Sequence, residues 1–286
     1  MAQIIDGKLI SKQIKDELKD KVAELKNEGK EICLAVIQVG NDPASTVYVG
    51  NKKKACEYIG IKSLAYEVPE ETTEEELLGI IDKLNKDDSV HGILVQLPVP
   101  KHINEETILN SIAVEKDVDA FHPVNVGKIM IGDFYFLPCT PAGVMEMLEY
   151  EGIDVTGKNC VVIGRSNIVG KPMNMLLLHK NGTVTICHSR TQNLKDVCNQ
   201  ADILICAIGK PRFFTKDYIK PSAVIIDVGI NHDENGKLCG DVNFDDVIST
   251  VSAITPVPGG VGPMTVAMLM ENCRKAAYEI YKEREI

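Results

Sequence analysis

The hydrophobic positions of this chain recur at two spacings, one helical and one typical of buried strands. Apolar residues from Ile10 to Leu25 lie at helical intervals, and this predicted helix ends near Gly29. Residues 32–39 are almost all apolar, which is typical of a strand buried on both faces of a parallel sheet. The alternation continues, so the first half is predicted to be a small α/β domain. Its later segments are a helix ending at residue 60, a strand at 61–68, a helix at 73–85 and a strand at 91–97.

Capping residues mark two helix starts in this half. Asp42 is expected to cap the helix that ends at residue 60, with Pro43 in its first turn. Thr73 and Glu76 have the spacing of a capping box. These signals fix where the two helices begin.

A second alternation of strands and helices occupies the rest of the chain. Residues 114–140 are rich in turn-forming residues, and a helix is predicted at 140–150. Residues 253–265 contain too much glycine and proline for regular structure, and a final helix follows them. We therefore predict an α/β fold with two α/β domains across a cleft. The other predicted segments are strands at 159–163, 183–187, 202–207 and 223–228, helices at 172–180 and 193–199, and a turn or small hairpin at Asn235-Gly236.

Composition excludes several classes of protein. Of the 286 residues, 44% are hydrophobic and 25% charged, which is ordinary for a soluble globular chain. The formal net charge of −10 argues against a general binder of nucleic acid or anionic membranes. The start of the chain lacks a signal-peptide core, and no apolar run approaches the ~18 residues of a membrane span, so we expect a cytoplasmic location. The nine cysteines form no C-x-x-C pair and the six histidines are scattered, so we expect buried reduced thiols and no metal site.

A glycine turn links the predicted strand 159–163 to a helix. Strand, glycine turn and helix together aim backbone N–H groups at a phosphate. The match to G-x-G-x-x-G is poor, because Ser166 and Val169 replace the second and third glycines and only Gly164 and a displaced Gly170 are present. The turn therefore indicates either a dinucleotide site or a plain strand–helix connection.

Basic and hydroxyl side chains favour NADP over NAD at this turn. No carboxylate occurs between residues 183 and 192, where an acidic residue would bind the 2′-hydroxyl of NAD. Arg165, Ser189 and Arg190 instead offer groups that suit a 2′-phosphate. The alternative is that both arginines are solvated surface residues.

Five polar residues of the first half are candidates for chemistry. Lys52 shares a helix face with Tyr48, and a desolvated lysine can transfer protons, although a lysine run is usually a solvated face. Gln96 ends an apolar strand, where a buried amide needs a partner. Asp119, like Asp117, could bind an amino-pyrimidine edge or simply cap its loop.

The loop at 256–265 is a further candidate site. It offers successive backbone N–H groups beside a helix start, which suits a substrate carboxylate or carbonyl. Ordinary turn chemistry would explain its glycines equally well.

Together these segments resemble the bifunctional methylenetetrahydrofolate dehydrogenase/cyclohydrolase family over nearly the whole chain. Any one motif would be weak, but six in the family's order are specific. The motifs are Tyr48-Val-Gly-Asn-Lys52 with Lys-Ala-Cys56, Val95-Gln-Leu-Pro98, Glu115-Lys-Asp-Val-Asp119, Pro138-Cys-Thr-Pro141, Gly164-Arg-Ser-Asn-Ile-Val-Gly-Lys-Pro172 and Pro256-Val-Pro-Gly-Gly-Val-Gly-Pro-Met-Thr265.

The resemblance implies roles for individual residues. Lys52 would be the active-site lysine, Gln96 its partner, Tyr48 the stacking tyrosine and Asp119 the pterin-binding aspartate. Ala120 departs from the family pattern, because many members have glycine there. Further substrate-binding residues are expected at Gly259, Gly260 and Pro263, and cofactor-binding residues at Gly164, Arg165, Ser166, Ser189, Arg190 and Ile230.

The resemblance also implies a domain plan and an activity. A catalytic domain would comprise residues 1–140 with a returning C-terminal helix at 263–286, and a Rossmann-like NADP-binding domain residues 141–262. The expected homodimer would use NADP to oxidise 5,10-methylenetetrahydrofolate to the methenyl form and hydrolyse that to 10-formyltetrahydrofolate. The alternatives are a monofunctional dehydrogenase of the same family, a different NADP-dependent two-domain oxidoreductase, and a non-catalytic nucleotide sensor.

Overall fold

The computed structural model describes residues 2–284, which fold into two compact units. The three-stranded unit comprises Lys12–Cys139 and residues 266–284. The six-stranded unit comprises residues 2–11 together with Thr140–Thr265. Both are α/β units with parallel sheets, as predicted.

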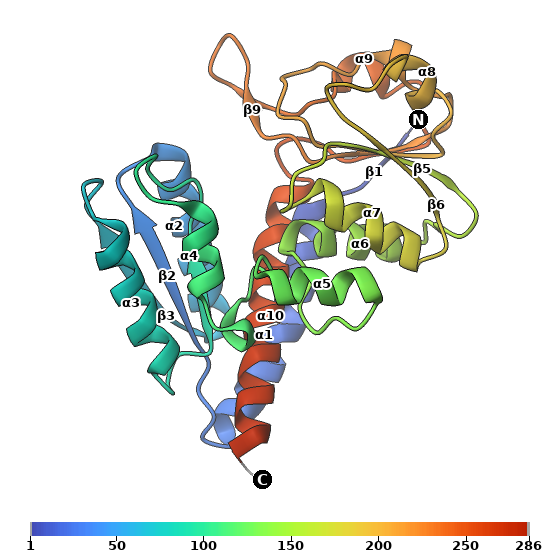
Figure 1. The fold of residues 1–286 in the computed structure, drawn as a ribbon. Helices are drawn as coiled ribbons and strands as arrows, with labels where there is room; N and C mark the ends of the chain where they lie inside the picture. The colour runs from blue at the N-terminus through green and yellow to red at the C-terminus, as the bar shows by residue number, and fades with distance from the viewer. Residues whose placement is uncertain (1, 285–286) are drawn as a thin grey trace. The chain divides into compact units, whose positions relative to one another are not determined.

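The three-stranded unit is built on strand β2, which is buried along its whole length. The sheet order is β3-β2-β4, and both pairings are parallel. Leu77, Ile81 and Leu84 of α3 pack with Ile108 of α4 against one face of this sheet. Figure 1 shows where these two helices lie in the ribbon. The elements are α1 (Gly7–Asn27), β2 (Cys33–Val39), α2 (Pro43–Ile59), β3 (Lys62–Val68), α3 (Glu74–Lys86), β4 (Gly92–Val95), α4 (Glu105–Ser111), η1 (Val114–Lys116) and α5 (Pro123–Ile131).

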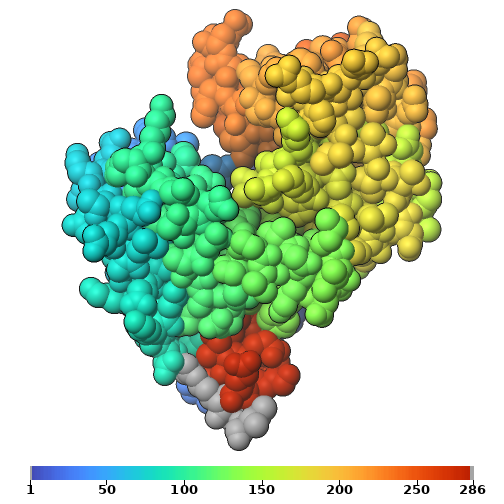
Figure 2. Space-filling view, viewed as in Figure 1, coloured from blue at the N-terminus to red at the C-terminus, as the bar shows by residue number. Residues whose placement is uncertain are grey.

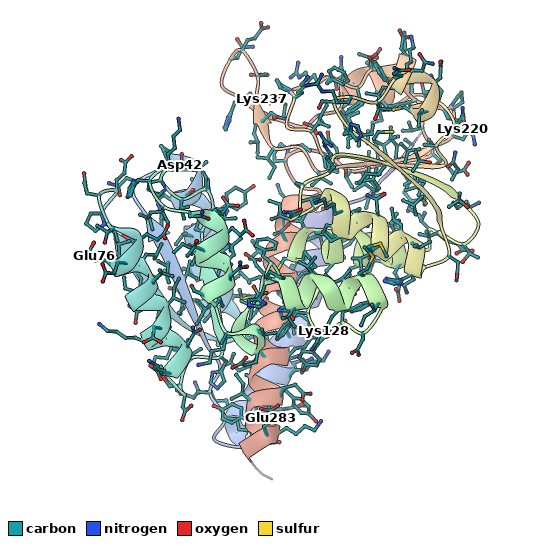
Figure 3. The ribbon with its side chains drawn as sticks, in the orientation of Figure 1. Asp42, Glu76, Lys128, Lys220, Lys237 and Glu283 are labelled. Atoms are coloured by element: carbon teal, nitrogen blue, oxygen red, sulfur yellow. The ribbon has the colours of Figure 1, made fainter. Side chains whose placement is uncertain are left out.

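The caps predicted for α2 and α3 are confirmed (Figure 3, Asp42 and Glu76). The Asp42 carboxylate accepts from the backbone N–H of Ser45 at 2.8 Å. Thr73 and Glu76 accept from each other's backbone N–H groups, which completes the capping box. The start of α2 is therefore fixed, and with it the face that carries Tyr48 and Lys52.

The last helix, α10 (Val261–Arg284), packs its later part into the three-stranded unit. The Asn272 amide donates to the carbonyl oxygens of Val118 at 2.8 Å and Leu137 at 2.9 Å. Cys273 lies so close to β4 that a Cβ at Gly92 would be 3.3 Å from its sulfur. The predicted return of the C-terminal helix is confirmed.

The six-stranded unit has the strand order β1-β11-β8-β7-β5-β6, and every pairing is parallel. Helices α8 and α9 cover one face and α6 and α7 the other (Figure 1). The elements are β1 (Gln3–Ile4), α6 (Cys139–Tyr150), β5 (Asn159–Ile163), α7 (Gly170–His179), β6 (Thr183–Cys187), α8 (Leu194–Cys198), β7 (Ile203–Cys206), η2 (Lys216–Tyr218), β8 (Val224–Asp227), β9 (Asn231–His232), β10 (Leu238–Cys239), α9 (Phe244–Val247) and β11 (Ala253–Ile254).

The strand order reverses at β5. The chain passes from β5 to β6 on one side and then returns to β7 on the other. Ligands of such sheets bind at the carboxyl ends of the strands beside this reversal. The hairpin of β9 and β10 forms at the predicted Asn235-Gly236 turn and projects from its unit as an orange finger (Figure 2).

Two sequence predictions are wrong in detail. The segment 253–265 is not wholly irregular, because β11 pairs between β1 and β8 and α10 begins at Val261. Its proline at 263 lies in the first turn of a helix, where no N–H is needed. The loop-rich stretch 114–140 also contains α5, which Pro123 starts and the His122 side chain caps.

Candidate active site

Lys52 is a buried cation in the three-stranded unit. Its side chain is 7% exposed, and its Nζ donates to the Gln96 Oε1 at 2.8 Å. The Gln96 Nε2 in turn donates to the Leu97 carbonyl at 2.7 Å, which fixes the amide so that its oxygen faces the lysine. The two residues that the sequence singled out separately therefore form one hydrogen-bonded pair.

Burial sets the protonation of this lysine. Loss of solvent lowers the pKa of Lys52 below its ordinary value, while the charge of Asp119 and the thiols of Cys139 and Cys273 oppose that shift. The neutral amine is thus accessible at a lower pH than for a surface lysine. A group that exchanges a proton in this way is suited to acid–base chemistry.

The neighbouring lysines behave differently. Lys53 and Lys54 are exposed, so the solvated-face interpretation holds for them and not for Lys52. Tyr48 lies one turn before Lys52 on α2 and is half-buried, and burial raises the pKa of its phenol. Tyr48 therefore stays a neutral ring on the same helix face as the ammonium.

The charged residues of the motif Glu115–Asp119 have different roles. The buried Lys116 ammonium donates to the carbonyls of Leu84, Asn85 and Asp87 at 2.8–3.0 Å, so it closes the C-terminus of α3. The Asp117 carboxylate accepts from the backbone N–H of His122 at 2.8 Å and from the Asn125 amide at 2.8 Å. Loop capping is thus the role of Asp117, and the half-buried Asp119 is left near Lys52.

Ala120 adopts the backbone conformation that glycine favours. Its φ is 57°, in the left-handed region, and its side chain is fully buried. An alanine in this region costs about 1 kcal/mol relative to glycine. The turn after Asp119 therefore keeps the left-handed conformation with alanine at this position, at a small energetic cost.

In the turn after β5, backbone segments approach each other too closely to leave room for a side chain. Gly164 has a φ of 138°, and a Cβ there would lie 2.3 Å from the Ala207 carbonyl oxygen. A Cβ on Gly170 would lie 2.2 Å from the Gly164 oxygen. Both positions require glycine, so the displaced second glycine serves a tight turn that the standard fingerprint does not describe.

The side chains around this turn are placed for an anion. Ser166 accepts from the N–H groups of Val169 and Gly170 at 3.1 and 3.2 Å, which fixes the start of α7. Arg165 is exposed, and within residues 2–284 its guanidinium has no protein partner. Ser189 and Arg190 follow β6, the parallel neighbour of β5, and are also exposed.

The remaining predicted site residues lie in the same six-stranded unit. Ile230 is exposed just after β8. Gly259 has a φ of 110°, and its carbonyl accepts from the Lys8 N–H at 3.0 Å. A Cβ on Gly260 would lie 2.6 Å from the Pro256 oxygen. Pro263 stands in the first turn of α10.

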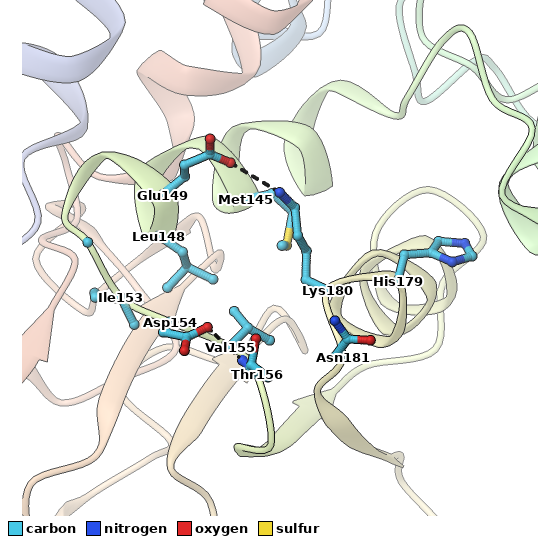
Figure 4. A pocket seen from close by; sticks show the side chains of 11 residues that line it. Met145, Leu148, Glu149, Ile153, Asp154, Val155, Thr156, His179, Lys180 and Asn181 are labelled. Carbon is cyan, nitrogen blue, oxygen red and sulfur yellow. Dashed lines mark hydrogen bonds and ion pairs between the residues drawn. The ribbon is translucent and has the colours of Figure 1, made fainter.

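A surface pocket of the six-stranded unit lies away from these residues (Figure 4). It has a volume of about 360 Å³ and is lined by the ends of α6 and α7 and the loop at 152–156. Lys180 and Glu149 form an ion pair of 3.3 Å across it. None of the predicted site residues contributes to its lining.

Sequence reasoning missed a pair of buried acids. Asp227 at the end of β8 and Asp241 after β10 are almost or wholly inaccessible to solvent. Burial raises the pKa of Asp227 to about 7, against three backbone N–H donors that lower it, and the Asp241 charge adds to the rise. The only sequence signals were an aspartate closing an apolar strand and glycines at 229 and 240.

All nine cysteines are buried, as predicted, and none forms a disulfide. Among residues 2–284, His, Cys, Asp and Glu side chains nowhere gather in threes that could hold a metal ion. Within the same range, no helix combines the length and the apolar character needed to cross a membrane.

Comparison with known proteins identifies the chain. The catalytic-domain model of tetrahydrofolate dehydrogenase/cyclohydrolase matches residues 5–119, and the NAD(P)-binding-domain model of that family matches residues 138–281. The chain belongs to the tetrahydrofolate dehydrogenase/cyclohydrolase family. The bifunctional protein FolD of Lachnoclostridium phytofermentans is 67% identical over 273 residues, which covers 96% of this chain and 97% of that protein.

Solved structures agree with this assignment. The bifunctional FolD enzyme of Campylobacter jejuni superposes with a TM-score of 0.95 at 53% identity, covering 98% of this chain and 99% of that one. The Trypanosoma brucei methylenetetrahydrofolate dehydrogenase-cyclohydrolase, solved with NADP and an inhibitor, gives a TM-score of 0.93 at 38% identity, with coverage of 97% and 98%.

The chain is therefore a bifunctional enzyme, a dehydrogenase and a cyclohydrolase that act on tetrahydrofolate derivatives. This family member has both the catalytic domain and the NAD(P)-binding domain. The two alternatives outside the family, another oxidoreductase and a non-catalytic sensor, are wrong.

Proposed function

We propose that Lys52 and Gln96 carry the hydrolytic half of an NADP-dependent conversion of 5,10-methylenetetrahydrofolate, through the methenyl form, to 10-formyltetrahydrofolate. The observation that carries this proposal is the 2.8 Å hydrogen bond between the buried Lys52 Nζ and a fixed amide oxygen. Hydrolysis bonds a water oxygen to the methenyl carbon, and the water loses a proton as it attacks. Neutral Lys52 accepts that proton, and Gln96 holds the amine in position. The bond from this carbon to N5 then breaks, N5 takes up a proton, and the added hydroxyl loses its own to leave the formyl group on N10.

The oxidative half places smaller demands on the protein. Bound NADP supplies the acceptor for the hydride from the methylene carbon. The methenyl cation left on the folate is stabilised by its own N5 and N10 lone pairs, so no protein base is needed. The chain's contribution to this step is to bind and orient the two reactants.

The residues around the Gly164 turn fit NADP. A Cβ on Gly164 or on Gly170 would clash with the protein's own backbone, so these glycines let the turn from β5 to the start of α7 close tightly, and Ser166 holds that turn. We assign the 2′-phosphate to Arg165 and Ser189, whose side chains are exposed at the carboxyl ends of adjacent strands. Arg190 and Ile230 complete the proposed cofactor contacts.

The folate contacts are proposed for residues that are half-buried or, at Gly259 and Gly260, buried. Asp119 would accept two N–H groups from the amino-pyrimidine edge, because Asp117 already satisfies the loop. Tyr48 would stack on the pterin from the face it shares with Lys52. Gly259, Gly260 and Pro263 would offer backbone at the α10 start to the substrate.

The proposed base predicts a pH dependence that Gln96→Glu alters. Because the neutral amine is the active form, cyclohydrolase kcat should rise with pH through the depressed pKa of Lys52 and then level off. A carboxylate at position 96 stabilises the ammonium and should move that rise to higher pH by about 1–3 pH units. The measurement is cyclohydrolase kcat with methenyltetrahydrofolate between pH 6 and 10.

Gln96→Met is the matched control, since it removes the hydrogen bond without adding charge. Its pH profile should not move upward, even if its rate falls. A Gln96→Glu profile that rises at the same pH as the unsubstituted enzyme would show that Lys52 is not the titrating group.

We also propose a homodimer, as the family resemblance implies. Strand β6 stands at the edge of the six-stranded sheet, and Ile186 on it is 41% exposed. Leu178 of α7, which packs on β6, is 52% exposed. An uncovered apolar strand edge is a surface that a second chain would protect. Light scattering tests the homodimer, because a measured mass equal to that of one chain, 31.4 kDa, would contradict it.

The cytoplasmic location stays a prediction.

A further inference from the structure

We infer that Asp241 is a positioning residue for the dinucleotide, because its buried carboxylate fixes the loop that follows β7 beside the Gly164 turn. The inference rests on the cofactor site proposed above. It adds a residue that does not touch the cofactor and that no motif of the sequence identified.

Three consecutive backbone N–H groups converge on this carboxylate. Asp241 is fully buried, and it accepts from Ile208 at 2.7 Å, Gly209 at 3.2 Å and Lys210 at 2.8 Å. The Asn231 amide, from the segment after β8, donates to the same carboxylate at 2.9 Å. One side chain thus holds the chain at the carboxyl ends of two adjacent strands.

Asp241 is itself held by the second buried acid. The Asp227 carboxylate accepts from the backbone N–H groups of Asp241 and Val242, each at 2.9 Å. Two glycines make room for this arrangement. A Cβ on Gly229 would lie 2.3 Å from an Asp241 oxygen, and one on Gly240 would lie 1.9 Å from an Asp227 oxygen.

The loop held by Asp241 is the neighbour of the proposed phosphate turn. Ala207 donates its N–H to the Ile163 carbonyl at 2.8 Å, and its own oxygen occupies the space that a Gly164 Cβ would need. If residues 208–210 move, the surface against which Gly164 turns moves with them. The loop at residues 208–210 therefore borders the site where the strand order reverses.

The position of the loop at residues 208–210 indicates which half of the cofactor lies beside it. The adenine ribose of a dinucleotide lies at the tip of the strand after the glycine turn, here β6. The nicotinamide half then extends to the opposite side, over β7 and β8. Asp241 should act on the part that NADP and NAD share, unlike Arg165.

This difference makes the inference testable through Asp241→Asn. The amide keeps one acceptor oxygen but turns a donor toward backbone donors, so the loop loses its fixed conformation. In the full-length enzyme, the dehydrogenase KM for NADP and for NAD should rise by the same factor, about tenfold. Cyclohydrolase kcat, measured on methenyltetrahydrofolate without any cofactor, should not change.

Asp245→Asn is the matched control, because it makes the same charge change at an exposed residue of the same unit. It should leave both KM values unchanged. If Asp241→Asn fails to fold, Asn231→Ala removes a single donor and should raise both KM values together by a smaller factor, about threefold.

Two outcomes would overturn the inference. One is unchanged KM values for both cofactors in Asp241→Asn. The other is a parallel loss of cyclohydrolase, which would mark Asp241 as a residue of general stability. A failure of the proposed cofactor contacts is separable, since it would appear as an unaltered NADP KM in Arg165→Ala while Asp241→Asn still raised both values.

Discussion

Lys52→Met should reduce the cyclohydrolase kcat by about 10²–10⁴-fold, the range that general acid–base groups contribute. Methionine matches the length of the lysine stem and suits a site that is 7% exposed, so the fold should tolerate it. It cannot accept a proton from water. The measurement is the decay of methenyltetrahydrofolate absorbance under steady-state conditions.

Folate binding and hydride transfer are the internal checks on this variant. Neither needs a protein base, so a dehydrogenase reaction should remain measurable in Lys52→Met, and the folate should still bind. Lys53→Met, at the exposed neighbouring residue, should keep both activities. Normal hydrolysis by Lys52→Met would refute the proposed base.

Arg165→Ala should raise the dehydrogenase KM for NADP by about 10–100-fold and leave the KM for NAD nearly unchanged. A hydrogen bond to a charged group contributes about 1.5–3 kcal/mol, and each 1.4 kcal/mol is a factor of ten. The guanidinium has no protein partner within the described residues, so its removal leaves no internal charge uncompensated. Initial rates with each cofactor at saturating folate provide the measurement.

Arg212→Ala is a suitable control for this substitution. Arg212 is an arginine of the same unit that pairs with Asp233 of the β9–β10 hairpin at 3.1 Å. Its loss should alter neither KM. If Arg165→Ala raised the KM for NADP and the KM for NAD equally, Arg165 would have to contact the pyrophosphate that both cofactors share rather than the 2′-phosphate.

Periodicity and capping predicted most of the elements because those signals are local. The run at 32–39 became β2, and the Thr73–Glu76 spacing gave the capping box of α3. The two-residue strands β1 and β11 were missed, because their pairing joins residues some 250 positions apart (Gln3 with Ala253) and leaves no local pattern. The first residues consequently group with the six-stranded unit rather than with the segment that follows them.

The candidate site was predictable as a set of residues but not as an arrangement. Three adjacent lysines are alike in sequence, and only tertiary burial separates Lys52 from Lys53 and Lys54. The same holds for Asp117 and Asp119, since only the donors of His122 and Asn125 reveal which one caps the loop. Asp241 had only a weak signal in the neighbouring glycines, because three of its four donors are backbone N–H groups that any sequence provides.

The two hydrogen bonds of the Asn272 amide join segments that are synthesised at different times. The carbonyls of Val118 and Leu137 leave the ribosome long before the helix that supplies their donor. Domains generally fold as they emerge, N-terminal first. Here, however, the six-stranded unit is synthesised in full, through Thr265, before the three-stranded unit has its last helix. The carbonyls of Val118 and Leu137 therefore lack this donor until Asn272 has been synthesised.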